Sequence, residues 1–231
     1  MDRRGVWVMP TEDDEVLARE MLQIGRRALR FEEYVLRRAW GVYYAVWALF
    51  FSVLFIIPSV IGLVAPSLTD SPYPYFLGYG VAGGLAGWAT YLNFEKVYRT
   101  IRLRRALFGG TQARRSLKIG GWILIGVSNF LLFLVPYYLL GFKGLSVGYL
   151  GLLYVGVWIY TALRRTFTDF PLEGVLAIAS FASSCLLSIY SILEGDYLIT
   201  ETSWLLTILV WVFCAFYALY HAPEMLVYDD E

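Results

Sequence analysis

The chain has 231 residues, of which 58% are hydrophobic and 16% are charged, and its formal net charge is zero. Soluble domains contain about 45–50% apolar and about 25% charged residues, so this composition predicts an integral membrane protein. The balance of 19 basic and 19 acidic residues excludes nucleic acid as the main partner. Both cysteines lie in apolar stretches, which argues against a disulfide framework. The scarcity of Asn and Gln suits a thermophile, although a membrane composition produces the same depletion.

Residues 1–39 predict a cytoplasmic amphipathic helix. Thr11 is a good N-cap, and the acids that follow it complement the positive end of the helix dipole. Apolar side chains then recur at helical spacing among arginines, and the segment lacks the features of a removable signal peptide. We therefore expect an interfacial helix that enters the first span near Trp40. This helix is either a membrane-surface anchor or a contact surface for a cytoplasmic subunit.

Six stretches are long and apolar enough to cross about 30 Å of hydrocarbon as helices. They are Trp40–Val64, Phe76–Phe94, Ile119–Leu140, Leu145–Leu163, Leu172–Leu193 and Thr202–Tyr220. The predicted fold is an all-α integral membrane protein, a six-transmembrane-helix bundle with an amphipathic N-terminal cytoplasmic/interfacial helix. Its expected parts are the N-terminal helix 1–39, the hairpins 40–94, 119–163 and 164–220, a basic loop 95–118 and a tail 221–231.

The distribution of positive charge predicts the orientation of these spans. Of the 19 Lys and Arg residues, all except Lys143 fall on the side that holds both termini. Cytoplasmic loops carry the excess of Lys and Arg, so both termini are expected in the cytoplasm. The expected location is the plasma membrane, with the chain crossing it several times.

The basic loop 95–118 has two readings that the sequence leaves open. Its positive charges orient the neighbouring spans and attract anionic lipid headgroups. Its first part also shows apolar residues at helical spacing among arginines, with Gly109-Gly110 as a stop, and such a helix lies on the membrane or docks a partner. The docking hypothesis rests on Val97, Arg99, Ile101, Arg102, Arg104, Arg105, Leu107 and Phe108.

Several residues inside the spans predict close helix packing or bends. Small residues four apart in the second span and serines along one face of the fifth favour packing within or between subunits. These residues are Gly80, Gly83, Gly84, Gly87, Ser180, Ser183, Ser184 and Ser188. Pro58 and Pro136 are each expected to kink a helix near its outer end, where neighbours re-satisfy the freed carbonyls. Both follow an Arg-Arg pair at similar spacing, which leaves open whether the first four spans form a parallel repeat.

The sequence shows no cluster typical of catalysis or of metal or cofactor binding. His221 is the single histidine, and no P-loop, HExxH or GxSxG motif occurs, so we expect neither an enzyme nor a cofactor. Ionisable residues deep in spans mark ion pathways, and here the most polar deep residues are Ser128 and Asn129. Glu173, just after Pro171, is expected to cap the fifth span.

The layout of these elements resembles that of ABC-2-type exporter permeases. That family also has cytoplasmic termini, six spans, an interfacial helix before the first span and a docking loop between spans two and three. The loop Glu194–Glu201 is shorter than its counterpart in that family. The resemblance implies a transporter subunit coupled through residues 95–110 to a cytoplasmic partner such as an ATPase. The alternatives are a non-transporting scaffold or accessory subunit of a homo- or hetero-oligomer, and a self-contained homo-oligomeric pore.

Overall fold

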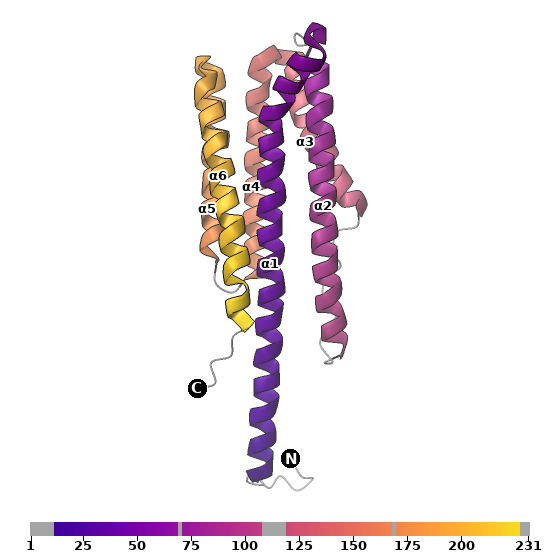
Figure 1. Cartoon of the computed structure of the whole chain (residues 1–231), viewed down its shortest axis with the longest axis vertical. Coiled ribbons are helices and arrows are strands. Elements are labelled where there is room, and N and C mark those ends of the chain that lie inside the picture. Colours follow the sequence, from indigo (N-terminus) through magenta and orange to yellow (C-terminus); the bar gives the residue numbers. More distant parts are fainter. Residues whose placement is uncertain (1–11, 69–70, 108–118, 168–169, 227–231) are drawn as a thin grey trace.

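The computed structural model describes residues 12–68, 71–107, 119–167 and 170–226, and in the stretches 12–29, 103–107 and 119–130 it describes mainly the backbone. All regular elements in these ranges are helices (Figure 1). The long helices are α1 (Glu12–Val64), α2 (Pro72–Leu107), α3 (Ile119–Leu140), α4 (Leu145–Thr166), α5 (Leu172–Glu194) and α6 (Tyr197–His221). Short 3-10 helices follow α1, α3 and α6: η1 (Pro66–Leu68), η2 (Gly141–Gly144) and η3 (Pro223–Leu226).

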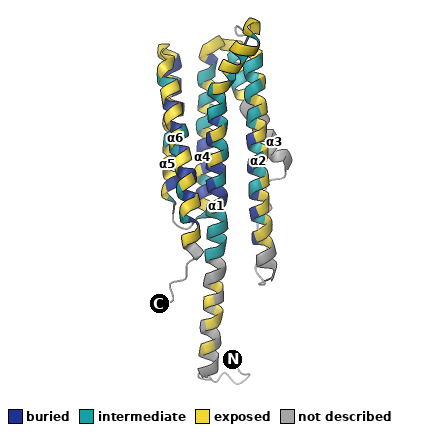
Figure 2. Ribbon diagram, in the orientation of Figure 1, coloured by how far each residue is buried: buried dark blue, intermediate teal, exposed yellow. Residues whose placement is uncertain are grey.

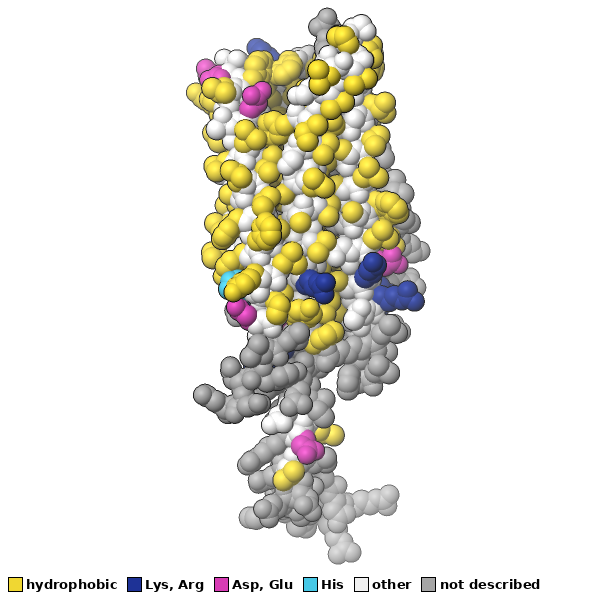
Figure 3. All heavy atoms as spheres, in the orientation of Figure 1, with side chains coloured by type: hydrophobic (Ala, Val, Ile, Leu, Met, Phe, Trp, Pro, Cys, Tyr) yellow, Lys and Arg dark blue, Asp and Glu magenta, His cyan; other side chains and the backbone are white. Residues whose placement is uncertain are grey.

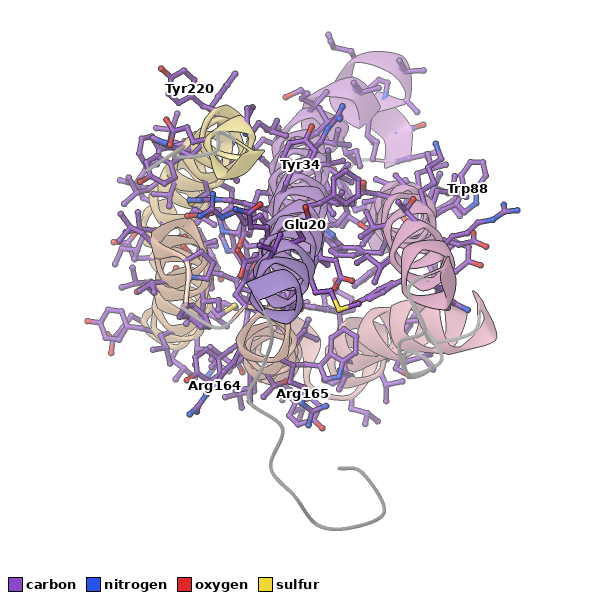
Figure 4. The ribbon with its side chains drawn as sticks, turned by 90° about the horizontal axis from the view of Figure 1, so that it is seen from below. Glu20, Tyr34, Trp88, Arg164, Arg165 and Tyr220 are labelled. Carbon is purple, nitrogen blue, oxygen red and sulfur yellow. The ribbon has the colours of Figure 1, made fainter. Side chains whose placement is uncertain are left out.

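The long helices stand side by side along one axis, with α1 in the middle of the bundle (Figures 1 and 4). The most extensive packing joins α5 to α6, α6 to α1, α1 to α2, and α4 to α5. On the face shown in Figure 3, hydrophobic side chains cover the bundle and Lys and Arg gather near its lower end. This surface suits hydrocarbon along the sides and headgroups at the ends.

Four described segments are long and apolar enough to cross a membrane: Arg30–Val64, Leu131–Thr166, Leu172–Glu194 and Tyr197–His221. An all-α membrane protein is therefore supported, whereas the expected count of six spans is not confirmed. The expected second span belongs to α2, where glycine, tyrosine and asparagine lower the apolarity. The expected third and fourth spans share the single segment Leu131–Thr166.

That shared segment reverses direction at η2. Gly141 has a φ of 63°, a left-handed conformation that favours glycine. A β-carbon on Gly144 would overlap the carbonyl oxygen of Pro136, and one on Gly148 would overlap the ring of Phe133. The absence of side chains at these two glycines lets α3 and α4 pack closely as an antiparallel pair.

The first helix joins the expected N-terminal helix to the first expected span. It runs without a break for 53 residues, which corresponds to about 80 Å at 1.5 Å per residue and exceeds a hydrocarbon core of about 30 Å. Figure 1 shows its N-terminal part projecting below the other helices along the bundle axis. The expected N-terminal helix and the first expected span are thus parts of one continuous helix. Helical propensity on both sides of Trp40 explains this, because Gly25 and Gly41 alone do not end a helix.

Two expected boundaries fall inside helices. The boundary between residues 39 and 40 lies within α1, and the boundary between 94 and 95 lies within α2. The expected amphipathic helix of the basic loop is therefore the end of α2, which continues to Leu107. Gly109-Gly110, the expected stop, lies outside the described residues.

The core is built from aromatic side chains of α1, α5 and α6. Trp211 is 2% exposed, and its ring lies 5.3 Å from that of Phe51, 5.7 Å from that of Tyr44 and 6.0 Å from that of Phe181, centroid to centroid. Tilted and edge-on contacts of this kind are favoured by the ring quadrupoles. Figure 2 shows buried residues along the faces where these helices meet.

Pro58 lies inside α1, where Figure 1 shows the helix bending near its upper end. A proline has no N–H, so the carbonyl four residues earlier, that of Leu54, loses its helical partner. The hydroxyl of Tyr79 on α2 donates to this oxygen at 3.4 Å. A neighbouring helix thereby re-satisfies the carbonyl that the proline leaves free. Pro136 lies inside α3.

Candidate functional site

Among the described residues, a buried ion pair joins α1 to α5 near the lower end of the bundle. Arg37 Nε donates to Glu173 Oε1 at 2.8 Å, and its second nitrogen donates to Oε2 at 3.2 Å. The Glu173 side chain is 2% exposed and that of Arg37 is 16% exposed. A two-bond contact between a guanidinium and a carboxylate is the strongest form of such a pair.

Local sequence places the carboxylate at the start of α5. Pro171 is the N-cap residue and makes no side-chain capping bond, while its carbonyl accepts from the backbone N–H of Gly174 at 2.9 Å. Glu173 lies in the first turn, where a negative charge is favoured by the helix dipole. The hydrogen bonds that the structure shows for its two carboxylate oxygens come from Arg37 of α1 and not from the backbone of α5.

Aromatic side chains surround the pair. The Tyr217 ring of α6 lies with its centroid 5.8 Å from Arg37 Cζ, a cation–π distance. The hydroxyl of Tyr44 and the indole N–H of Trp40 are buried and have no hydrogen-bond partner among the described residues. Side chains of three helices, α1, α5 and α6, therefore meet at this charge pair.

The pair acts as a clamp between helices. Its carboxylate accepts two bonds from the same arginine, and no further ionisable side chain of the described residues is bonded to either partner. This contact couples the position of α1 to that of α5.

A second polar region lies where α5 meets α6. The hydroxyls of Ser184 and Thr207 are 2.6 Å apart, and Ser184 also donates to the carbonyl of Ser203 at 2.8 Å. The indole of Trp204 donates to Ser188 at 2.9 Å. Because these polar groups already satisfy one another, the region serves to hold the two helices together.

The predicted packing residues are distributed over several surfaces. Ser184 and Ser188 are buried against α6, Ser180 is half-buried with its hydroxyl on the carbonyl of Ala177, and Ser183 is exposed. Among the glycines of α2, a β-carbon on Gly83 would lie 3.5 Å from the Phe50 ring of α1. Gly80 and Gly84 are exposed, and β-carbons on Gly84 and Gly87 would meet nothing within 4 Å.

The predicted docking residues are also split. Val97 is 7% exposed and Ile101 is 5% exposed, and both belong to the core cluster that contains Ala39 and Trp40 of α1. These two apolar side chains are covered within the bundle and do not face a partner. Arg99 and Arg102 are exposed. Phe108 and the side chains of Arg104, Arg105 and Leu107 lie outside the described residues.

The remaining candidates are the polar residues Ser128 and Asn129 of α3. Ser128 is exposed and lines an apolar hollow of about 450 Å³ on α3, together with Leu131 and Pro136, whereas the side chain of Asn129 lies outside the described residues. In the part of the chain that the structure describes, no group of three or more His, Cys, Asp or Glu side chains is arranged for a metal ion.

Sequence reasoning missed the partnership of Arg37 and Glu173, which lie 136 residues apart. One signal was present. Glu173 is an acid at the edge of a predicted span, and a charge that enters a membrane is compensated by an opposite charge. The sequence alone does not say which of the cytoplasmic arginines provides it.

Comparison of the chain with models of protein families, with curated proteins and with solved structures gives no match in any of the three. The similarity in layout to exporter permeases therefore has no support beyond the layout itself.

Proposed function

We propose that this chain is a non-enzymatic membrane subunit that holds a cytoplasmic partner through the projecting part of α1. We name residues 12–29 the arm. The observation that carries the proposal is the continuity of α1, which passes in one helix from the arm to the Arg37–Glu173 clamp. A partner bound to the arm is thereby attached to a fixed point in the bundle.

The arm presents apolar side chains that nothing in the described structure covers. Met21 is 66% exposed and Val16 is 52% exposed. Both belong to the arm, which projects below the other helices in Figure 1. Each apolar Å² left in water forgoes about 25 cal/mol of burial free energy. An amphipathic helix with uncovered apolar residues suits a groove or a second helix on a soluble partner.

The two functional classes differ in what the partner does. Support for a scaffold comes from the core, where aromatic rings and mutually bonded polar groups fill the described interior between α1, α5 and α6. Support for a permease comes from the clamp, because a rigid helix would carry a partner's movement from the arm into the bundle. We favour the scaffold, and a permease coupled to a cytoplasmic ATPase is the second candidate.

If the arm binds the partner, changing its exposed apolar side chains should weaken that binding. Replacing Val16 and Met21 together with glutamate is expected to lower recovery of a stoichiometric partner at least tenfold, because charges replace the apolar contacts. The measurement is affinity purification from native membranes in mild detergent with quantitative mass spectrometry. Gln23→Glu, an exposed polar site on the same arm, is the matched control and should retain the partner.

Each result of this purification decides between the classes. A partner with a nucleotide-binding site, together with substrate flux that the double variant abolishes, would favour the permease. A partner without flux would favour the scaffold. Equal recovery from the double variant and the wild type would refute docking on the arm, and a homo-oligomer alone would favour a self-contained pore.

Cysteine labelling tests the proposed orientation, with both termini in the cytoplasm. Both native cysteines are buried, so a thiol reagent should label only a cysteine that is introduced on the surface. Lys143 in η2 and Arg165 at the end of α4 are both exposed. In intact cells a membrane-impermeant maleimide should label Lys143→Cys, and it should label Arg165→Cys only after permeabilisation. The reverse pattern would place the termini outside, and labelling of both from one side would mean that α4 does not cross.

A further inference from the structure

A groove of about 350 Å³ lies between α1 and α6. Its walls include Ala45, Ala48 and Ser52 from α1 and Val212, Ala215 and Phe216 from α6. Phe216 is 70% exposed, so the groove opens on the outer surface of the bundle. Small side chains of both helices leave the space, and larger ones such as Leu49 of α1 and Phe216 of α6 flank it.

The groove suits hydrocarbon. The lining consists almost wholly of apolar side chains, and the hydroxyl of Ser52 already donates to the carbonyl of Ala48 at 2.9 Å. A cavity without free polar groups does not hold ordered water, because a water molecule needs two to four polar partners. In a membrane, the available hydrocarbon is the acyl chain of a lipid.

A positive charge lies in line with the lower end of the groove. Arg38 precedes Ala45 by seven residues and Ser52 by fourteen, a spacing that places all three on one face of α1. Arg38 is exposed, and its hydrogen bond among the described residues goes to the Tyr34 hydroxyl at 3.4 Å. A guanidinium has five N–H donors, so most of them remain for an anion. Its neighbour Arg37, in contrast, is bound to Glu173.

An acidic side chain also lies just after this end of α6. The Glu224 carboxylate of η3 is 2.6 Å from the imidazole of His221, the last residue of α6. That contact partners the carboxylate locally, and Arg38 forms no ion pair with it in the described structure. The basic group at the groove therefore stays open to a ligand.

The distances match one leaflet of a bilayer. The fourteen residues from Arg38 to Ser52 correspond to about 21 Å along the helix. A bilayer with its headgroups is about 40–45 Å thick, so one leaflet extends about 20–22 Å. A phospholipid with its phosphate at Arg38 would thus place an acyl chain along the full length of the groove.

We propose that the α1–α6 groove is a binding site for one anionic phospholipid, with an acyl chain between the two helices and the phosphate on Arg38. The site needs only the membrane location of the bundle. It is independent of the partner proposed for the arm, and failure of either proposal leaves the other standing.

The test uses the purified full-length protein in mild detergent, titrated with dioleoyl-phosphatidylglycerol and, in parallel, with dioleoyl-phosphatidylcholine. Native mass spectrometry measures the number of bound lipids and the apparent affinity. The wild type should retain one phosphatidylglycerol in preference to phosphatidylcholine. Arg38→Gln should lower the affinity for phosphatidylglycerol about tenfold, the size expected for loss of a charge-assisted hydrogen bond. It should lower the affinity for phosphatidylcholine less, because the choline cation offsets the charge of that lipid's phosphate.

Two further variants separate the headgroup contact from the groove. Ala45→Trp fills the groove and should lower binding of both lipids. Arg165→Gln removes an exposed arginine at the end of α4 and should behave as the wild type. Equal losses from Arg38→Gln and Arg165→Gln would show only diffuse charge attraction and overturn the site. A change in dimer content with Ala45→Trp, without a change in lipid binding, would assign the groove to a second copy of the chain.

Discussion

Replacing Glu173 with alanine should lower the free energy of unfolding by about 3–5 kcal/mol, because it leaves the Arg37 guanidinium partly buried without its carboxylate. The pair itself need not stabilise the bundle strongly, since desolvation of both ions offsets much of their attraction. The loss arises from the single unpaired charge. The measurement is unfolding in mixed micelles with increasing dodecyl sulfate, followed by far-ultraviolet circular dichroism.

A double-mutant cycle shows whether the clamp is the cause. The variant Arg37→Met with Glu173→Leu removes both charges and should recover most of the stability, because packed apolar residues replace a buried pair at little cost. Arg38→Ala, on the exposed neighbour, should stay within about 0.5 kcal/mol of the wild type. If Glu173→Ala also stays within that margin, the pair does not fasten α1 to α5. Arg37→Met alone and Glu173→Leu alone complete the cycle, and if their two losses simply add in the double variant, the residues are not coupled.

Replacing Trp211 with alanine should lower the free energy of unfolding by about 3–5 kcal/mol. This side chain is 2% exposed, and it packs on rings from α1 and α5 at once. Its indole N–H also donates to the carbonyl of Ala177 at 3.0 Å. Because the hydrophobic effect does not drive helices together inside a bilayer, the destabilisation comes from weaker dispersion attraction around the cavity and from the missing hydrogen bond.

Two variants divide this effect into its parts. Trp211→Phe keeps a ring and removes the N–H. It should therefore lower the free energy of unfolding by less than Trp211→Ala does, by about 1 kcal/mol for the missing hydrogen bond and a further small amount for the smaller ring. Phe216→Ala removes an aromatic side chain of the same helix that is 70% exposed, and it should change stability little. Circular dichroism in the same detergent series measures all three variants. Equal losses from Trp211→Ala and Phe216→Ala would mean that the aromatic core is not what holds α6 in place.

The all-helical class and the membrane character were predictable from composition and apolar run length. Both depend on local properties, since a long apolar stretch in lipid has to satisfy its own backbone. The bend at Pro58 was equally local. The donor that completes it, the Tyr79 hydroxyl, was not, because nothing in the sequence specifies which neighbour faces the freed carbonyl of Leu54.

Boundaries and faces were predicted less well. Val97 and Ile101 have the spacing of a partner-docking face, yet that face is turned toward α1. Apolar periodicity indicates that one face of a helix is buried against another surface. It does not indicate whether that surface belongs to the same chain or to another. The arm raises the same question, and there no described element provides the cover.

By itself, the sequence determined that this is a helical membrane protein whose positive charges gather at one end of the bundle. These properties follow from composition and charge order, which act on each segment separately. Only the tertiary structure decided that α1 continues beyond the bundle, that Arg37 and Arg38 have different environments, and that Glu173 is bound from 136 residues away. The physical reason is that buried surfaces, ion pairs and grooves form between segments that are distant in the sequence. The free energy of each contact depends on which surfaces the fold brings together.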